Sequence, residues 1–332
     1  MPRSERAVSE QSLRVATTGS RRLVSLKIGP LNVSLSWEDC EATEWPHPFY
    51  IPFTTEAVPD LHLHIHCQED LPSYPLEDRL FEAQDNRWNL YRHPDGYVLE
   101  TYDTAFGQKN RVALMKHDWT CGRVFVRPEP TRGGKRTATQ CVARRAWSLP
   151  ILSRQLGELL VVNLLSCGRG ALVHALGVNQ WGKGLLFVGH SGAGKSTLAN
   201  LYKGLAGITI LGDERIILGR TNGAFSISGT PWSGGAMTVA AETVPLHRVY
   251  FLEHAPENVL HIEQPGRLLP LLFQQLFLPF WDAEGIAFVL EFVEDLLRTV
   301  PAARLGFVND DRVIGFLREQ DAPKTEQHEA LR

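Results

Sequence analysis

The chain has 332 residues, of which 43% are hydrophobic and 21% charged, and its formal net charge is −3 at pH 7. This composition is typical of a soluble globular protein, and the slightly acidic balance argues against a polybasic nucleic-acid or membrane binder. Prolines and glutamines interrupt the longest apolar run, residues 268–281, so it does not read as a membrane span. The N-terminus also lacks the apolar core of a signal peptide. We therefore expect a cytoplasmic protein that binds neither nucleic acid nor membrane.

The five cysteines are scattered, and no two of them have the C-x-x-C spacing of a metal or redox site. Their odd number also argues against a framework in which every cysteine is paired. This pattern predicts reduced thiols, as in a cytosolic protein. The five are Cys40, Cys67, Cys121, Cys141 and Cys167.

The first part of the chain has the sequence pattern of a β-rich domain. Residues 1–20 are rich in Ser, Arg and Glu, which predicts a disordered tail. Residues 21–147 then carry short apolar stretches separated by turn residues, so we expect a small β-rich N-terminal domain there. The expected strands are residues 23–28, 61–65, 88–91, 97–101 and 112–115. The polar segment 131–136 is expected to be a loop or a hairpin tip.

Three histidines alternate along one of these expected strands. His62, His64 and His66 would point to the same face, where three imidazoles can hold zinc. No carboxylate or later histidine pair has the spacing that would complete such a site. We therefore favour a half-exposed strand over a zinc site.

Strand and helix patterns alternate in residues 148–320, which predicts a mixed α/β fold with a sheet covered by helices. The expected helices are residues 156–165, 194–202, 267–277, 284–298 and 310–319. The expected strands are residues 171–176, 185–188, 208–211, 215–218, 224–228, 249–252 and 304–308. Residues 220–223 read as the turn of a hairpin. We expect residues 321–332 to be a flexible tail.

A phosphate-binding loop motif, G-x-x-x-x-G-K-[ST], stands between an expected strand and an expected helix. With the threonine that follows, it comprises Gly189, His190, Ser191, Gly192, Ala193, Gly194, Lys195, Ser196 and Thr197. Its glycines let successive backbone N–H groups face phosphate oxygens, and the helix N-terminus adds positive potential. Lys195 is expected to reach the β- and γ-phosphates and Ser196 to ligate magnesium. The motif therefore predicts binding of ATP with Mg²⁺, although it does not separate ATP from GTP.

Two acidic residues follow the next expected strand. Asp213 and Glu214 come directly after residues 208–212, and a return strand would bring them beside the phosphate loop. Magnesium prefers hard oxygen ligands such as carboxylates, so we expect both to hold the metal, although an exposed acidic turn would look the same. Transporter-type ATPases share these two motifs but place a glycine-rich signature between them. Here the similar tract, residues 232–235, comes afterwards, which argues against that class.

Three segments in order resemble HPr kinase/phosphorylase, whose fold is shared with phosphoenolpyruvate carboxykinases. They are Val173-His174-Ala175, the loop 189–196 and residues 211–216, Leu-Gly-Asp-Glu-Arg-Ile. The resemblance implies an HPr kinase-like catalytic domain at residues 148–320. It also implies that Asp213 is the base that deprotonates the acceptor hydroxyl, that His174 lies close to that carboxylate, and that Glu214 helps to hold the metal.

Residues 148–317 look more closely similar to a group of uncharacterised bacterial proteins related to HPr kinase. The segments that carry this likeness are residues 168–170, 229–232, 251–254 and 279–282. Two features depart from the true HPr kinases. Glu214 stands where the family has a second Asp, and residues 229–235 take the place of a Glu-x-Arg-Gly-Leu-Gly signature. The resemblance therefore does not identify HPr as the substrate.

The sequence thus predicts a kinase that transfers the γ-phosphoryl group of ATP to a hydroxyl of a protein, a peptide or a small molecule. The N-terminal domain would recognise this acceptor, and the sequence is compatible with a homo-oligomer. The alternative is a nucleotide-binding regulatory or scaffold module without transfer. Trp232 could lie near the active site, and Arg215 and Arg267 could neutralise phosphate charge. For Trp232 we favour a packing role, and for the two arginines a position at the surface or at a helix end.

Overall fold

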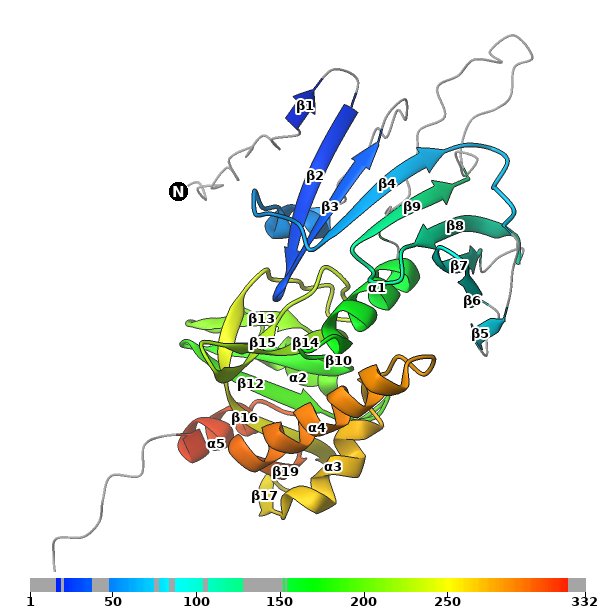
Figure 1. The fold of residues 1–332 in the computed structure, drawn as a ribbon. Coiled ribbons are helices and arrows are strands. Elements are labelled where there is room, and N and C mark those ends of the chain that lie inside the picture. Colours follow the sequence, from blue (N-terminus) through cyan, green and yellow to red (C-terminus); the bar gives the residue numbers. More distant parts are fainter. Residues whose placement is uncertain are drawn as a thin grey trace, which may run out of the picture.

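A computed structural model describes residues 16–18, 21–37, 48–74, 78–83, 87–103, 107–127, 152 and 154–321. It has a mixed α/β fold with two sheets and a β-rich N-terminal region, as expected (Figure 1). The segment 131–136 lies outside the described residues. So do most of the two expected tails, although Ala16–Thr18 forms a short strand, β1. Among the described helices, none is both long and apolar enough to cross a membrane.

The N-terminal sheet has nine strands in the order β1-β2-β3-β4-β9-β8-β7-β6-β5. They are β1, β2 (Arg21–Ile28), β3 (Leu31–Trp37), β4 (Leu61–Cys67), β5 (Arg79–Glu82), β6 (Trp88–His93), β7 (Gly96–Tyr102), β8 (Lys109–Met115) and β9 (Cys121–Val126). A short 3-10 helix, η1 (Pro48–Phe53), lies between β3 and β4. All of the strands expected in this region are present. The strands β3, β5 and β9 were not expected, and β3 and β9 join β4 through parallel pairings of distant segments.

The histidine strand is half-exposed, as we favoured. Leucine and isoleucine of β4 are buried, while His62 and His64 are half-buried and lie 3.1 and 3.3 Å from the hydroxyl of Ser36. No group of three or more His, Cys, Asp or Glu in the described part of the chain is arranged to hold a metal ion.

The prediction of reduced thiols is wrong at Cys67, which is disulfide-bonded, whereas Cys121 is free. Disulfide formation depends on which cysteines lie close together in the folded protein, and their spacing in the sequence does not reveal this.

The C-terminal sheet has ten strands, and its main path runs β13-β11-β12-β16-β15-β14-β10-β18. Its strands are β10 (Ala171–Val173), β11 (Ala175–Gln180), β12 (Lys183–Val188), β13 (Ile208–Gly212), β14 (Ile216–Thr221), β15 (Ala224–Ser228), β16 (Thr243–His254), β17 (Val259–Ile262), β18 (Leu276–Phe277) and β19 (Ala302–Phe307). β12, β16 and β19 run parallel to one another. The helices are α1 (Arg154–Ser166), α2 (Lys195–Tyr202), α3 (Pro265–Phe273), α4 (Ala283–Thr299) and α5 (Arg312–Asp321).

Helices cover both faces of this sheet. Alternate residues of β12 and β16 point to opposite sides, because successive side chains of a strand do so. Leu186 and Phe251 pack with α3 and α4, whereas Phe187 and Tyr250 pack with α2 and α5. The uninterrupted apolar run of β12 therefore reflects a strand buried on both faces, as its sequence predicted.

Two expected elements differ from the structure. The expected strand 171–176 is divided at His174 into β10 and β11, because β10 pairs with β14 and β18 while β11 pairs with β12 and β13. The backbone N–H of His174 donates to the carbonyl of Gln275 at this bend, at 2.8 Å. The expected helix 267–277 ends at Phe273, since the chain then turns to form β18 against β10.

Helix α1 joins the two sheets (Figure 1). Its buried leucines and valines belong to one hydrophobic cluster with residues of β2, β3 and β4, and that cluster also includes Trp232. Arg169, just after α1, forms an ion pair with Asp60 at 2.7 Å. At the turn between β2 and β3, an added Cβ on Gly29 would lie 3.1 Å from Ile217 of β14. The N-terminal sheet is therefore packed directly against the elements that carry the candidate site.

Candidate functional site

The glycine-rich loop, residues 189–194, connects the end of β12 to the start of α2. Gly192 and Gly194 have φ angles of 86° and 96°, which residues with a side chain rarely adopt. A Cβ on Gly194 would also lie 2.7 Å from the ring of Phe307. The loop therefore needs glycine at this position for two independent reasons. The strand–loop–helix arrangement is the one that the motif predicted, and it leaves the first N–H groups of α2 without partners inside the helix.

Lys195 lies at the first turn of α2 and is only 6% exposed. Its ammonium group donates to the backbone carbonyls of Gly189 and His190 and so closes the loop on itself. Burial lowers the pKa of Lys195 to about 8, and the negative charge of Asp213 opposes that shift. Near neutral pH the side chain is therefore mostly charged, but it loses its proton far more readily than an ordinary lysine.

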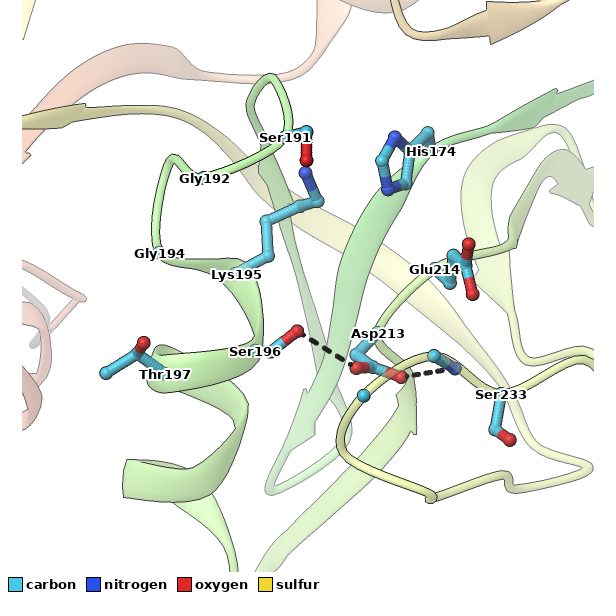
Figure 2. Close-up of a pocket in the computed structure, with 12 residues that line it drawn as sticks. His174, Ser191, Gly192, Gly194, Lys195, Ser196, Thr197, Asp213, Glu214 and Ser233 are labelled. Carbon is cyan, nitrogen blue, oxygen red and sulfur yellow. Dashed lines mark hydrogen bonds between the residues drawn. The ribbon is translucent and has the colours of Figure 1, made fainter.

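Asp213 follows β13 and is 3% exposed, and its carboxylate accepts three hydrogen bonds. The backbone N–H of Gly234 donates to Oδ1 at 2.8 Å, and that of Ala236 donates to Oδ2 at 2.7 Å. The Ser196 hydroxyl donates to Oδ2 at 3.3 Å (Figure 2). The acidic residue thus lies beside the glycine-rich loop, as its position after a return strand predicted. A buried carboxylate held by three donors has a fixed orientation.

The loop that holds Asp213 was not assigned a role from the sequence. We call residues 233–236 the clasp loop, because two of its backbone N–H groups donate to the carboxylate of Asp213. A Cβ on Gly234 would lie 2.9 Å from both oxygens of Asp213, so only glycine allows this approach. Met237 closes the turn with φ 52° and donates its N–H to the carbonyl of Gly234 at 3.2 Å. Backbone strain of this kind is concentrated at functional sites.

These elements enclose a cavity of about 530 Å³ (Figure 2). It is lined by His174, Ser191, Gly192, Gly194, Lys195, Ser196, Thr197, Asp213, Glu214, Ser233, Gly234 and Gly235. Three residues of the predicted loop are not part of this lining: Gly189, the exposed His190 and the buried Ala193. The cavity therefore brings the predicted phosphate-binding, metal-binding and catalytic residues together. The pair Gly234-Gly235 was the sequence signal for the clasp loop, but it did not reveal the contact with Asp213.

Arg215 holds Glu214 and does not line the cavity. Its guanidinium donates to the two carboxylate oxygens of Glu158 at 2.8 and 3.4 Å and lies 3.3 Å from the carboxylate of Glu214. It also lies over the ring of Phe277, 4.1 Å from its centroid. This arginine therefore lies in a largely buried ion-pair cluster, and the expectation of an arginine at the surface or at a helix end is wrong for it. Arg267 is exposed on α3 and also lies outside the cavity lining.

Trp232 packs in the core, although the residue after it enters the cavity. Its side chain is 5% exposed, and a Cβ on Gly157 of α1 would lie 2.6 Å from it. Tyr50 belongs to the same cluster and donates to the carbonyl of Leu152. The clasp loop is thereby anchored at its first end against α1 and the N-terminal sheet.

The cavity has the donor types that magnesium requires. Ser196, Asp213 and Glu214 offer hydroxyl and carboxylate oxygens, and Mg²⁺ in nucleotide sites is held by one or two carboxylates together with phosphate oxygens. The residues present therefore fit a magnesium–nucleotide complex better than an all-protein metal cage.

Comparisons with known proteins give little more. No family model matches the sequence, and no curated protein matches it. Among solved structures, the chain is similar to the HPr(Ser) kinase/phosphatase of Coxiella burnetii, with 15% sequence identity. The match covers 45% of this chain and 86% of that one, with a TM-score of 0.25. At that score the likeness carries no argument about activity, so the function must be argued from the cavity.

Proposed function

We propose that the protein is an ATP- and Mg²⁺-dependent kinase that transfers the γ-phosphoryl group to an acceptor hydroxyl. One observation carries this proposal: the glycine-rich loop, with Lys195 and Ser196, opens into the same cavity as Asp213 and Glu214. In such a site the loop amides and the lysine cradle the phosphates, and catalysis is largely positioning and charge stabilisation. The acceptor is a hydroxyl of a protein, a peptide or a small molecule.

The two carboxylate oxygens of Asp213 have different hydrogen-bond partners, and we assign them different roles. A carboxylate has about four lone-pair sites, and three of these already accept hydrogen bonds here. Oδ2 orients Ser196, whose lone pairs are then available to the metal. Among the residues that the structure describes, Oδ1 accepts only from Gly234, and we assign its second site to the proton of the acceptor.

In the transfer step, the acceptor hydroxyl gives its proton to Oδ1 of Asp213, and its oxygen bonds to the γ-phosphorus. The bond between the γ-phosphorus and the β–γ bridging oxygen breaks, and ADP leaves. Bound Mg²⁺ would be held by Ser196 and Glu214, with Asp213 acting through the Ser196 hydroxyl that it orients, and it would neutralise charge on the phosphates. His174 lines the same cavity and is assigned the tuning of Asp213. The N-terminal sheet packs in one hydrophobic cluster with Trp232, which precedes the clasp loop. We assign to this sheet the recognition of the acceptor.

The rival proposal is a nucleotide-binding regulatory module without transfer. It is favoured by the same three hydrogen bonds on Asp213, since a carboxylate that orients Ser196 and the clasp loop needs no further role. The kinase proposal is favoured by His174, because a module that only binds nucleotide needs no base and gains nothing from a second titratable group in the cavity with Asp213.

Asp213→Asn separates the two proposals. We expect this variant to keep nucleotide affinity within a few-fold of wild type but to lose about 10²–10⁴-fold in transfer rate, which is the usual contribution of a general base. The measurement uses γ-labelled ATP with cell extract as the source of acceptor, alongside calorimetric titration of nucleotide. Full transfer by Asp213→Asn would place the base elsewhere. If the wild type binds ATP but neither transfers nor hydrolyses, the regulatory module is the correct account.

A further inference from the structure

A second cavity, of about 270 Å³, lies between the N-terminal sheet and the C-terminal sheet, and we call it the junction cavity. Its walls come from three segments: Lys27 and Gly29 at the end of β2, residues 52–55 at and after the end of η1, and Gly229 with residues 241–243 beside the connection from β15 to β16. The end of β2 points toward the C-terminal sheet (Figure 1). No residue lines both this cavity and the one beside the glycine-rich loop, so the two are separate.

Lys27 and Glu242 give the junction cavity one positive and one negative charge. In the part of the chain that the structure describes, neither side chain forms an ion pair, with the other or with a third residue. Oε2 of Glu242 accepts a hydrogen bond from the side-chain amide of Asn179 at 2.8 Å, which fixes the direction of the carboxylate. The ammonium group of Lys27 and Oε1 of Glu242 are therefore both available to a ligand.

The size and chemistry of the junction cavity define the ligand that it fits. Pockets for drug-sized molecules usually measure about 300 Å³ or more, so this one suits a smaller molecule. Two opposite charges that line one cavity without pairing are complementary to a zwitterion. Pro52 and the buried Phe53 add apolar surface. A small amino acid matches all three features through its carboxylate, its ammonium group and its short side chain.

The junction cavity adjoins both ends of the connection that carries the clasp loop. At its start, Gly229 donates its N–H to the carbonyl of Glu242 at 3.2 Å, so the two ends are held together. Just inside, Ala240 donates its N–H to the carbonyl of Leu211 at 3.3 Å, two residues before Asp213. A ligand bound between the two charges therefore joins the base of this connection to the N-terminal sheet.

We propose that the junction cavity is a regulatory site for a small free amino acid, which binds Lys27 through its carboxylate and Glu242 through its ammonium group. By fixing the base of the connection, the ligand steadies the clasp loop and with it the carboxylate of Asp213. The binding of the amino acid is independent of the proposed kinase function, whereas its effect on transfer rests on that function.

Calorimetric titration of the full chain without nucleotide tests the site. The probes are L-alanine, propionate, which lacks the ammonium group, and ethylamine, which lacks the carboxylate. Because Lys27 is exposed, we expect L-alanine to bind weakly, in the millimolar range. Propionate and ethylamine should bind about tenfold more weakly still, since each loses one hydrogen bond between charged groups.

Two variants test the assigned charges. Lys27→Met and Glu242→Gln should each weaken L-alanine binding by about tenfold, for the same reason. A glutamine at position 242 still offers an oxygen to Asn179, so the fold should be kept, which circular dichroism checks. The matched controls are Lys183→Met and Glu257→Gln, which change exposed residues outside the cavity lining and should bind L-alanine as wild type does.

A second measurement tests the effect on the clasp loop. With γ-labelled ATP and cell extract as the source of acceptor, saturating L-alanine should raise the transfer rate of wild type severalfold. The same addition should leave the rate of Lys27→Met unchanged. A wild-type rate that does not respond to L-alanine overturns the regulatory role.

Three binding results overturn the site itself. They are a wild type that does not bind L-alanine, propionate that binds as tightly as L-alanine, and variants at Lys27 and Glu242 that bind as tightly as wild type. A protein that binds L-alanine as expected but transfers no phosphate contradicts the proposed kinase function, and the regulatory role with it, while the amino-acid site stands. The two measurements therefore separate failure of this site from failure of the proposed function.

Discussion

The two walls of the cavity are built in different ways. The first wall, the glycine-rich loop with Lys195 and Ser196, is contiguous in the sequence and needs only the turn from β12 to α2. The second wall is assembled from distant parts: Asp213 after β13, and the clasp loop in the long connection between β15 and β16. In the proposed function, a local motif therefore supplies phosphate binding, whereas the alignment of the carboxylate depends on the packing of the whole domain. Changes to the two walls should accordingly have separable effects on binding and on transfer.

After Asp213→Asn, the largest effect is expected from adding a methyl group to Gly234 in the second wall. In Gly234→Ala the new Cβ would lie 2.9 Å from both oxygens of Asp213 and displace the clasp loop. Misplacement of a catalytic group by about 1 Å can cost about 10²-fold in rate, so we expect that loss of transfer with nucleotide affinity nearly unchanged. The matched control is Gly235→Ala, whose Cβ would meet Ser196 at an ordinary 3.4 Å. Equal transfer rates in the two variants, measured with γ-labelled ATP, would contradict the role of the clasp loop.

A change in the first wall should act on binding. Lys195→Ala removes a charge-assisted contact to phosphate worth about 1.5–3 kcal/mol, which corresponds to tenfold or larger weakening of ATP binding. The fold should stay intact, because within the described part of the chain the ammonium group bonds only to the loop carbonyls of Gly189 and His190 and not to the core. Calorimetric titration and circular dichroism test both statements. Affinity equal to that of wild type would remove Lys195 from the site.

The same lysine predicts a dependence of binding on pH. Phosphate binds the protonated form, and the pKa of Lys195 is about 8 in the free protein. Below that pKa the side chain is charged and this residue adds no pH dependence. Above it, affinity should fall as the proton is lost, by about tenfold at pH 9. Lys195→Arg keeps its charge throughout this range, so its affinity should not fall between pH 8 and pH 9. A wild-type affinity that stays constant to pH 9 would contradict the assignment.

The smallest effect is expected for the metal requirement. Glu214→Gln removes a hard ligand but leaves Asp213 and Ser196 in place, so transfer should need a severalfold higher Mg²⁺ concentration to reach the same rate. Glu158→Gln is the matched control, because Glu158 also pairs with Arg215 but does not line the cavity. Rates measured over a magnesium series would contradict the assignment of Glu214 if both variants had the same requirement.

The features that the sequence predicted are those set by local sequence, and the features that it did not predict depend on contacts between distant segments. The helices that cover the C-terminal sheet, the strand–loop–helix turn and the acidic residues after β13 were predicted because periodicity and spacing encode them. The break at His174 was not predicted, since it follows from two strands pairing with different neighbours. The clasp loop was also missed, because an approach of Gly234 to Asp213 leaves no periodic pattern. For Trp232 a packing role was favoured over a place near the active site, but its link to Tyr50 and α1 required the fold.

The central claim is that both walls act on one ligand, with the γ-phosphate between them. The most direct test is a crystal structure of the full chain with Mg²⁺ and a non-hydrolysable ATP analogue. We predict that the β- and γ-phosphates lie against the glycine-rich loop, that the Lys195 ammonium group leaves the carbonyls of Gly189 and His190 to contact them, and that the γ-phosphate faces Oδ1 of Asp213. A nucleotide bound outside this cavity, or one whose γ-phosphate points away from Asp213, would contradict the account.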